Sequence, residues 1–296
     1  MASSPIIFTV CAINQLANAI VLGDSLNIHN PDYDFQIGLV DNLSNIPNPF
    51  QSPYPIIEVN SLNIKGLVDM AKRFTHEELV ADCKPFFAEY FLEKTEKLIF
   101  IDCTSVVFQS ISIISDILDQ SNIILTPQLL FANVHPDEKQ ILNSGIYHSG
   151  FIGLKNSAET FNFLGWWGEN TRTKGFKNMC KGLNADQLWL EHVPAMYEGV
   201  HILKESGINI GDWNLPERNI SELKSTAKLY SINYRDKSFP AEYHQQLNKY
   251  FHRKLTKITP AFGIENPDKL TTGKRIAKKI RSINKMIDTF IDKITT

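Results

Sequence analysis

Residues 98–107 read LIFIDCTSVV, and this stretch decides the fold of the chain. It begins as an apolar run of strand length and reaches an acid at Asp102. The segment before it, HEELVADCKPFFAEYFLEK, repeats apolar residues at the 3.6-residue spacing of a helix. A helix followed by a buried strand with a polar end is typical of α/β proteins, whose ligands bind at the carboxyl ends of strands. The stretch therefore predicts both the fold class and the edge of the sheet that holds the site.

The rest of the chain alternates strand and helix signals. Strands are predicted at residues 5–13, 35–40, 56–59 and 122–126, and helices at 15–28, on either side of Thr75 and at 158–172. This order predicts an α/β fold with a Rossmann-type mixed, mostly parallel sheet flanked by helices. Asn14, Asp41 and Asp102 each follow a predicted strand, so we expect all three near one edge, where a nucleotide would bind. Polar residues in ordinary turns would explain each of them equally well.

Composition excludes several classes of protein. The chain has 296 residues, 43% of them apolar, which suits one large globular domain or two small ones. Its net charge of −2 argues against a nucleic-acid partner. Four cysteines stand far apart without a C-x-x-C pair, which favours reduced thiols in a cytoplasm over a zinc site or a disulfide framework. We find neither a signal peptide nor 18 consecutive apolar residues, so a cytoplasmic protein is expected.

Three segments of the second half carry polar residues in patterns typical of binding sites. HSGFIGL, residues 148–154, is a turn that enters a strand, with glycines where a backbone can approach a ligand. GLNADQLW, residues 182–189, is predicted to open a helix, so Asp186 is either an N-cap or a catalytic acid. GINIGDWNLPER, residues 207–218, packs one tryptophan, amides and an arginine into a loop that favours a binding surface.

Together these segments resemble the bacterial GT-A-type glycosyltransferases related to glycosyltransferase family 8, which are often found in surface-polysaccharide synthesis. The resemblance covers about residues 5–220 and is most specific in the DQxW…VP and GxNxxxWNLxxR blocks. It implies a GT-A-like fold, a nucleotide-sugar donor, a surface-glycan or lipid-linked glycan acceptor, and retention of anomeric configuration. It also implies that Asp186 and Gln187 lie at the reacting carbon. The residues that it assigns to the donor are Lys84, Asp102, Thr104, Gly150, Trp213, Asn214 and Arg218, beside Asn14 and Asp41 from the strand ends.

The resemblance further implies a divalent cation, Mn²⁺ or Mg²⁺, held by an Asp-x-Asp triplet and a later histidine. Here Thr104 stands in place of the second acid, and residues 229–235 contain no histidine. Such cations prefer carboxylate or imidazole ligands, so Asp102 alone would hold one weakly. We therefore expect weak cation dependence, with Lys84, Arg218 or Arg235 neutralising the diphosphate instead.

Two other functions compete with glycosyl transfer as explanations of the same residues. A sugar-1-phosphate nucleotidyltransferase would need a glycine-rich phosphate loop after the first strand, and residues 11–17, CAINQLA, contain no glycine. A catalytically silent scaffold of the same fold, which binds glycan or partner proteins, stays open as the alternative.

The C-terminus is predicted as a separate element, with a catalytic domain at 1–262 and a basic amphipathic helix at 263–296. From Lys274 onward the tail holds seven basic and two acidic residues, a net charge of +5. Ile276, Ile280, Ile283 and Ile287 lie on one helical stripe. This pattern predicts either peripheral binding to an anionic membrane, on its inner face, or packing of the helix on its own domain or on a partner subunit in a homo-oligomer.

Overall fold

The computed structural model describes residues 4–46, 50–131, 138–178, 181–234, 240–250 and 252–265, with only the backbone given at 138–140. The chain divides into two units, Met1–Gly263 and Ile264–Thr296, and the fold below is that of the first. The predicted basic helix, from Lys274 onward, and Arg235 both lie outside the described residues.

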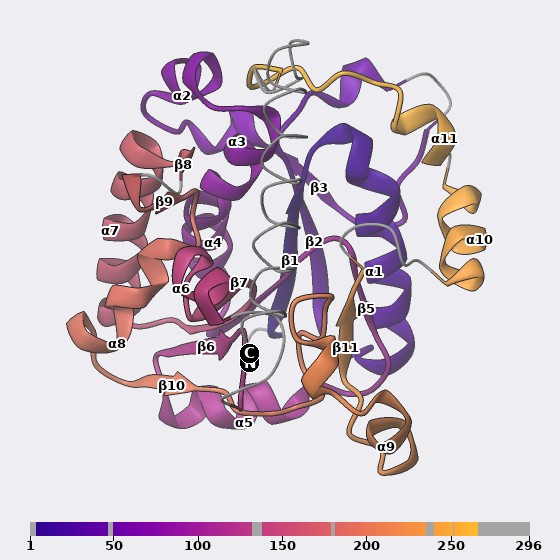
Figure 1. The fold of residues 1–296 in the computed structure, drawn as a ribbon. Coiled ribbons are helices and arrows are strands. Elements are labelled where there is room, and N and C mark those ends of the chain that lie inside the picture. Colours follow the sequence, from indigo (N-terminus) through magenta and orange to yellow (C-terminus); the bar gives the residue numbers. More distant parts are fainter. Residues whose placement is uncertain are drawn as a thin grey trace, which may run out of the picture. The chain divides into compact units, whose positions relative to one another are not determined.

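The first unit is built on a seven-stranded sheet with the order β10-β6-β7-β4-β1-β2-β3 (Figure 1). The strands are β1 (Ile6–Cys11), β2 (Asp34–Leu39), β3 (Ile56–Glu58), β4 (Lys97–Ile101), β6 (Ile123–Pro127), β7 (Tyr147–Lys155) and β10 (Val200–Ile202). Strand β7 pairs antiparallel with β4 and β6, and every other pair in this sheet is parallel. The start of β7 therefore lies at the edge where the parallel strands end. The predicted mixed, mostly parallel sheet is confirmed.

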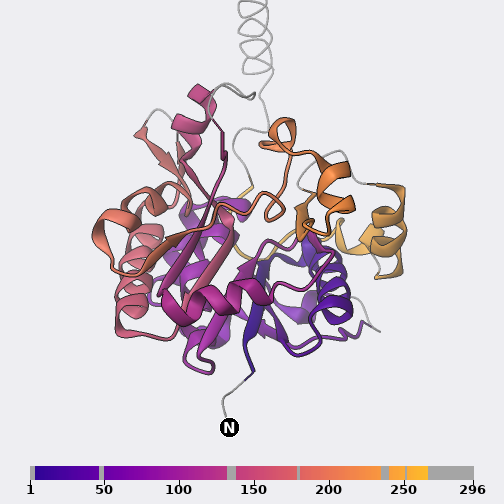
Figure 2. The same ribbon diagram turned by 90° about the horizontal axis from the view of Figure 1, so that it is seen from below.

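Side chains of β1 alternate between two cores, one on each face of the sheet. Phe8 and Val10 belong to one core, and Ile7 and Cys11 belong to the other. Burial on both faces explains the uninterrupted apolar run of this strand. The helices α2 (Leu67–Arg73), α3 (His76–Asp82), α4 (Lys84–Leu92) and α7 (Ala158–Lys174) line the first core, and α1 (Leu16–His29), α5 (Ser112–Gln120), α10 (Ala241–Lys249) and α11 (His252–Leu255) line the second (Figures 1 and 2).

The junction between α3 and α4 places two charged side chains inside the first unit. Helix α3 begins with a capping box, in which the Glu78 amide donates to Thr75 Oγ1 and the Thr75 amide donates to the Glu78 carboxylate. Helix α3 ends at Asp82 and α4 begins at Lys84, and both side chains are buried. The capping box thus sets the residue at which α3 begins, and with it the positions of Asp82 at the end of α3 and of Lys84 at the start of α4.

The stretch 98–107 divides into two strands around the turn at 102–104. Its second part forms β5 (Ser105–Val107), which leaves the main sheet and pairs antiparallel with β11 (Ser231–Asn233). This pairing brings Asn233 opposite Ser105, although the two residues are far apart in the sequence. The turn that contains Asp102 therefore lies between the main sheet and a second, two-stranded sheet.

The predicted helix after residue 182 is wrong. Residues Leu183–Asn184 form the short strand β9, Ala185 has a φ of 47°, and a 3₁₀-helix follows at Leu188–His192 before α8 (Val193–Met196). A left-handed alanine breaks helical geometry just before Asp186. The Asp186 side chain caps no helix, so the capping explanation of this residue is also wrong.

In the part of the chain that the structure describes, no helix is long and apolar enough to cross a bilayer.

Candidate functional site

Lys84 and Asp186 form an ion pair in which both side chains are almost fully buried. Lys84 Nζ lies 2.7 Å from Asp186 Oδ2, and it also donates to the hydroxyl and the carbonyl oxygen of Ser149 at 3.0 and 3.3 Å. The ammonium is further placed 5.0 Å from the ring centroid of Phe100, where a cation–π contact stabilises it. All three N–H bonds of Lys84 are thus engaged by protein atoms. Lys84 holds Asp186 against the start of β7.

Gln187 is fixed beside this pair through both ends of its amide. Its Oε1 accepts from the Ser149 backbone N–H at 3.3 Å, and its Nε2 donates to the Ser144 carbonyl at 2.8 Å. The carbonyl of Asp186 accepts from the indole of Trp167 at 2.9 Å. The structure therefore brings Lys84, Asp186 and Gln187 together around one residue of β7, Ser149.

Asp102 is joined to the same part of β7 through its backbone. Its N–H donates to the carbonyl of Gly150 at 2.9 Å. Gly150 cannot easily carry a side chain, because a Cβ there would lie 2.6 Å from the ring of His148. Asp102 and the Lys84–Asp186 pair are thus neighbours across the β4–β7 ladder.

The Asp102 carboxylate makes local hydrogen bonds to Thr104. Asp102 Oδ1 accepts from the Thr104 N–H at 3.1 Å and lies 2.8 Å from the Thr104 hydroxyl. That hydroxyl lies 2.7 Å from Asn233 Oδ1 on β11. Within the described ranges, no group of three or more His, Cys, Asp or Glu side chains is arranged to hold a metal ion. One carboxylate, one hydroxyl and one amide are a poor set for Mn²⁺ or Mg²⁺.

The loop at 207–218 is fastened to β6 and β7 through an aromatic stack. The Trp213 ring lies 3.9 Å from the His148 ring, at an interplanar angle of 16°. Asn209 Nδ2 lies 3.1 Å from both His148 Nδ1 and Thr126 Oγ1, and the Gly150 N–H donates to the same Nδ1. Because two N–H donors meet at Nδ1, this nitrogen acts as an acceptor and carries no proton.

Asn214 maintains the shape of the same loop. Its Oδ1 accepts from the Gly211 N–H at 2.9 Å, and its Nδ2 donates to the Asn209 carbonyl at 3.2 Å. Gly211 is required here because a Cβ would lie 2.2 Å from the ring of Trp213. The Asn214 side chain is therefore engaged in supporting Trp213.

Arg218 is a buried cation at the end of this loop. Its Nη2 lies 2.9 Å from Glu217 Oε1, and the Glu217 carboxylate also accepts from the N–H groups of Leu130 and Phe131. Burial lowers the pKa of Arg218. Nε and Nη1 of Arg218 are buried and find no hydrogen-bond partner among the described residues. Buried unpaired donors are costly, which is why this guanidinium stands out from an ordinary structural ion pair.

Asn14 and Asp41 lie at the carboxyl ends of β1 and β2. Asp41 is fully buried, and its Oδ1 accepts from the N–H groups of Asn42 and Ala261 at 2.8 and 3.2 Å. Burial raises the pKa of the Cys11 thiol at the end of β1, and the nearby carboxylates of Asp41 and Asp102 raise it further. The strand-end residues therefore share one edge, and Asp41 Oδ1 joins its own turn to the distant segment at Ala261.

Asp82 is a buried acid that the sequence did not single out. Neither of its carboxylate oxygens has a hydrogen-bond partner in the described part of the chain, and a Cβ on Gly175 would lie 1.9 Å from one of them. Burial raises the pKa of Asp82 well above its ordinary value, and the Asp186 and Glu78 carboxylates raise it further, while Lys84 opposes them. The surroundings of Asp82 thus favour the protonated, neutral form of its carboxyl group, close enough to the Lys84–Asp186 pair to feel both charges.

This raised pKa predicts a pH dependence of stability. The folded state holds the Asp82 proton more tightly than the unfolded state, so the free energy of unfolding falls as pH rises above 3.8, the ordinary value of this carboxyl. Asp82→Asn cannot ionise, so it should gain stability relative to the wild type between pH 5 and pH 8. Urea unfolding of both proteins at the two pH values measures this gain, and equal pH dependence would contradict it.

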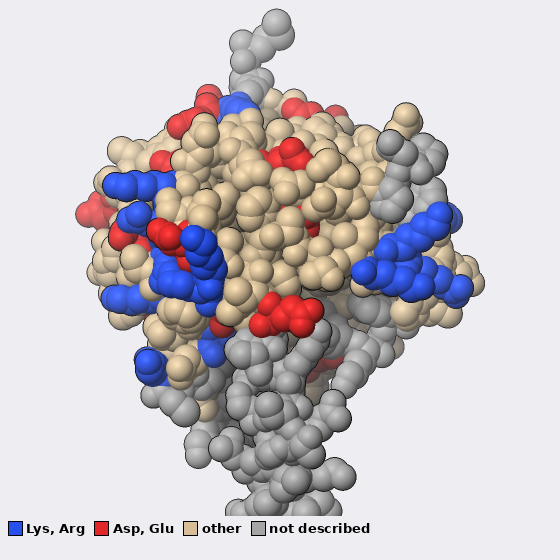
Figure 3. Space-filling view, turned by 90° about the horizontal axis from the view of Figure 1, so that it is seen from above, with Lys and Arg blue, Asp and Glu red and all other residues tan. Residues whose placement is uncertain are grey.

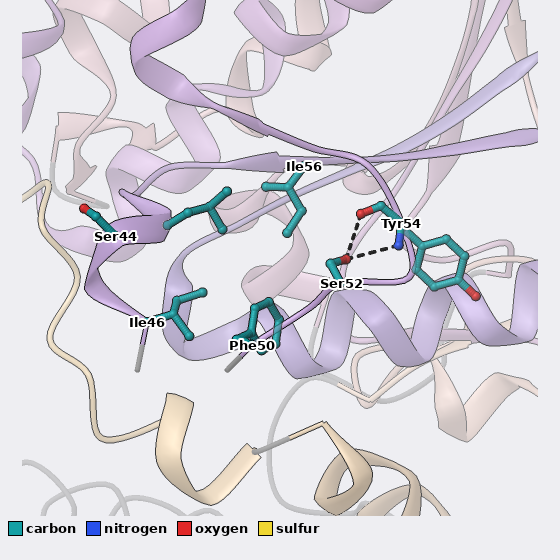
Figure 4. A pocket seen from close by; sticks show the side chains of 7 residues that line it. Ser44, Ile46, Phe50, Ser52, Tyr54 and Ile56 are labelled. Carbon is teal, nitrogen blue, oxygen red and sulfur yellow. Dashed lines mark hydrogen bonds between the residues drawn. The ribbon is translucent and has the colours of Figure 1, made fainter. Parts of the chain in front are cut away.

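A cavity of about 490 Å³ lies in the segment that follows Asp41 (Figure 4). Its lining comes from the segment between β2 and β3 and from β3 itself: Leu43, Ser44, Ile46, Phe50, Ser52, Tyr54 and Ile56. It includes none of the predicted site residues. Because this lining is mostly apolar and holds no charged group, the cavity does not suit a diphosphate.

Sequence reasoning missed four residues that hold the site together. Ser149 and His148 stand within a segment that the sequence marked for its glycines, and Asn209 stands within the marked loop. Their polarity inside apolar surroundings was the available signal. Asn233 gave no local signal, because only the pairing of β5 with β11 brings it to Thr104.

Comparison with known proteins supports the fold. No family model matches the chain. YfnF of Bacillus subtilis (strain 168), an uncharacterized protein, is 24% identical over 176 residues, which cover 56% of this chain and 57% of YfnF. The chain thus matches little more than half the length of that relative.

Solved structures share the fold over most of the chain. The galactosyltransferase LgtC, solved with donor and acceptor sugar analogues, has a TM-score of 0.51 at 14% identity and covers 83% of this chain and 95% of LgtC. This chain has the fold of the GT-A glycosyltransferases. The bifunctional glycosyltransferase WbbM has a TM-score of 0.52 at 13% identity, over 86% of this chain and 51% of WbbM. GlyE of Streptococcus pneumoniae TIGR4 has a TM-score of 0.50 at 12% identity, over 88% of this chain and 66% of GlyE.

Proposed function

We propose that this chain is a glycosyltransferase that moves a sugar from a nucleotide-sugar donor to a surface glycan or a lipid-linked glycan, with retention of configuration. The observation that carries the proposal is the buried Lys84–Asp186 pair with Gln187, beside Asp102, at the ligand-binding edge of a GT-A fold. A relation to glycosyltransferase family 8 and a role in surface-polysaccharide synthesis belong to the same proposal.

In this proposal Asp186 and Gln187 act at the reacting carbon of the donor sugar. Lys84 orients the Asp186 carboxylate, and Ser149 fixes Gln187, so neither group has to reorganise during the reaction. Trp213 holds its loop against His148 through a ring stack, and two buried guanidinium nitrogens of Arg218, Nε and Nη1, have no partner among the described residues and are assigned here to the donor diphosphate. Asn14, Asp41 and Gly150 belong to the nucleotide side, because they lie at the ends of β1, β2 and the start of β7.

A nucleoside diphosphate is expected to bind at this edge with a dissociation constant in the micromolar range, roughly −8 kcal/mol. Isothermal titration calorimetry with UDP, GDP, CDP, ADP and dTDP, and with their sugar conjugates, measures this directly. We expect one base to bind at least tenfold more tightly than the others. Absence of binding by every nucleotide would contradict the proposed function.

The C-terminal region is proposed to hold the protein on an anionic membrane from the cytoplasmic side. Lys249, Arg253 and Lys257 are exposed, and no ion pair to them is found in the described ranges. No acid occurs between residues 243 and 264. Lys and Arg side chains gather in one group at the right of Figure 3, the side on which α10 and α11 lie in Figure 1. The basic tail from Lys274 would add to this charge.

Deletion of residues 264–296 should abolish binding to vesicles that contain anionic lipid. Each basic residue near such a surface contributes about 1 kcal/mol, and salt screens the attraction. Co-sedimentation of the full and truncated chains at low and high salt measures the effect. A deletion that instead changes the oligomeric mass in light scattering, without any vesicle binding by the full chain, would favour a homo-oligomer.

A further inference from the structure

The Asp102–Thr104–Asn233 cluster is joined by hydrogen bonds between its own side chains. The Thr104 hydroxyl lies within 2.8 Å of an oxygen on each of the other two residues, and it has a single proton to donate. Asn233 Nδ2 is buried and has no hydrogen-bond partner among the described residues, so the amide orientation that turns Nδ2 toward Thr104 lets it donate to Oγ1 while the Thr104 hydroxyl donates to Asp102. The position of Thr104 is stabilised further because the Tyr234 N–H donates to the Thr104 carbonyl at 2.9 Å.

The charge of this cluster is also too low for a tightly bound divalent cation. Asp102 brings one negative charge, Thr104 and Asn233 are neutral, and the described residues contain no group of three or more His, Cys, Asp or Glu side chains that could hold a metal ion. Affinity for hard cations rises with the number of charged oxygen ligands. A cation that bound here would have to break the hydrogen bond between Thr104 and Asp102. In exchange it would gain only the neutral Thr104 hydroxyl as a ligand. The geometry, however, converges: two side chains from the turn after β4 and one from β11 meet at one point.

We propose that this chain binds its donor without a divalent cation, because Thr104 and Asn233 close the position between them and Asp102 with hydrogen bonds. Asn233 acts as a positioning residue that keeps the Thr104 hydroxyl on Asp102. The statement about the donor rests on the proposed function, whereas the statement about the cation concerns the cluster alone.

The test titrates Mn²⁺ alone into the protein, followed by electron paramagnetic resonance of the unbound ion. The full-length wild type should show no saturable binding up to millimolar Mn²⁺. Thr104→Asp should introduce binding, and Thr104→Asp with Asn233→His should tighten it about tenfold more, because carboxylate and imidazole are then added at the converging positions. Thr104→Val, which keeps the shape and removes the hydroxyl, is the matched control and should bind no Mn²⁺.

Two results would overturn the inference. One is stoichiometric, micromolar Mn²⁺ binding by the wild type that Asp102→Asn abolishes. The other is failure of both Thr104→Asp variants to bind Mn²⁺ although circular dichroism shows them folded, since the three positions would then not converge. If the double variant does not fold, Thr104→Asp alone and the wild-type titration still decide.

The nucleotide measurements separate this inference from the proposed function. A nucleoside diphosphate that binds equally well in EDTA and in Mn²⁺ supports both. Binding that requires Mn²⁺ contradicts the inference and leaves the glycosyltransferase proposal standing. If no nucleotide binds under either condition, the proposed function fails, and the Mn²⁺ titration alone still tests the cluster.

Discussion

Replacing Asp186 with asparagine is expected to lower kcat by roughly 100-fold and to change donor affinity by less than about threefold. Asparagine keeps the shape of the side chain and removes the charge that Lys84 compensates at 2.7 Å. The proposed function places this group at the reacting carbon, away from the nucleotide. Gln187→Ala should behave in the same way, because the amide that Ser149 and Ser144 fix is lost.

Steady-state turnover of the preferred donor, together with calorimetry of the same donor, measures both quantities. Asp69→Asn, at an exposed position on α2, is the matched control and should change neither. If Asp186→Asn retains near-normal turnover, the reaction centre lies elsewhere. If it loses donor affinity in proportion to turnover, Asp186 binds the nucleotide part instead.

Replacing Lys84 with methionine is expected to reduce the free energy of unfolding by about 3–5 kcal/mol. The substitution leaves the Asp186 carboxylate buried without its partner, and it also removes two hydrogen bonds to Ser149. Lys84→Met combined with Asp186→Leu removes both charges, and it should recover most of the stability because apolar residues of similar size tolerate such sites well. Urea denaturation at pH 7 of both single variants and of the double variant gives the coupling energy.

The exposed pair Lys177–Glu77 is the control for this cycle. Its atoms are 3.5 Å apart and the Glu77 side chain is 80% exposed, so Lys177→Met should cost less than about 1 kcal/mol. A loss of similar size for Lys84→Met would mean that the buried pair contributes no more than a surface contact. Failure of the double variant to recover stability would point to the Ser149 hydrogen bonds as the larger contribution.

Local patterns in the sequence predicted much of the sheet. The apolar runs at 5–13, 35–40 and 122–126 became β1, β2 and β6, because strands buried on both faces need continuous apolar sequence. Helix α3 was predicted from the 3.6-residue apolar spacing of the segment that begins at His76, and the structure adds a capping box at Thr75 that defines its start. Asn14, Asp41 and Asp102 came to one edge because parallel strands end on the same side.

Contacts between distant segments could not be predicted in the same way. Asn233 reaches Thr104 because β11 pairs with β5, about 130 residues earlier in the chain. The spacing of apolar residues within each segment does not predict which distant strands pair. The role of Ser149 depends on Lys84, the first residue of α4, which packs on one face of the sheet and is distant from Ser149 in the sequence. The segment after residue 182 was misjudged because Ala185 adopts a left-handed conformation that its residue type rarely shows.

The measurement that tests the account most directly is turnover of a panel of nucleotide sugars by the full-length protein, with release of nucleoside diphosphate as the readout. We expect slow hydrolysis of one donor by the wild type, in EDTA as well as in Mn²⁺, and loss of that release in Asp186→Asn. Release that is absent for every donor, while a nucleotide still binds, would contradict an enzyme and favour a silent scaffold. Release that is unchanged in Asp186→Asn would contradict the assigned reaction centre.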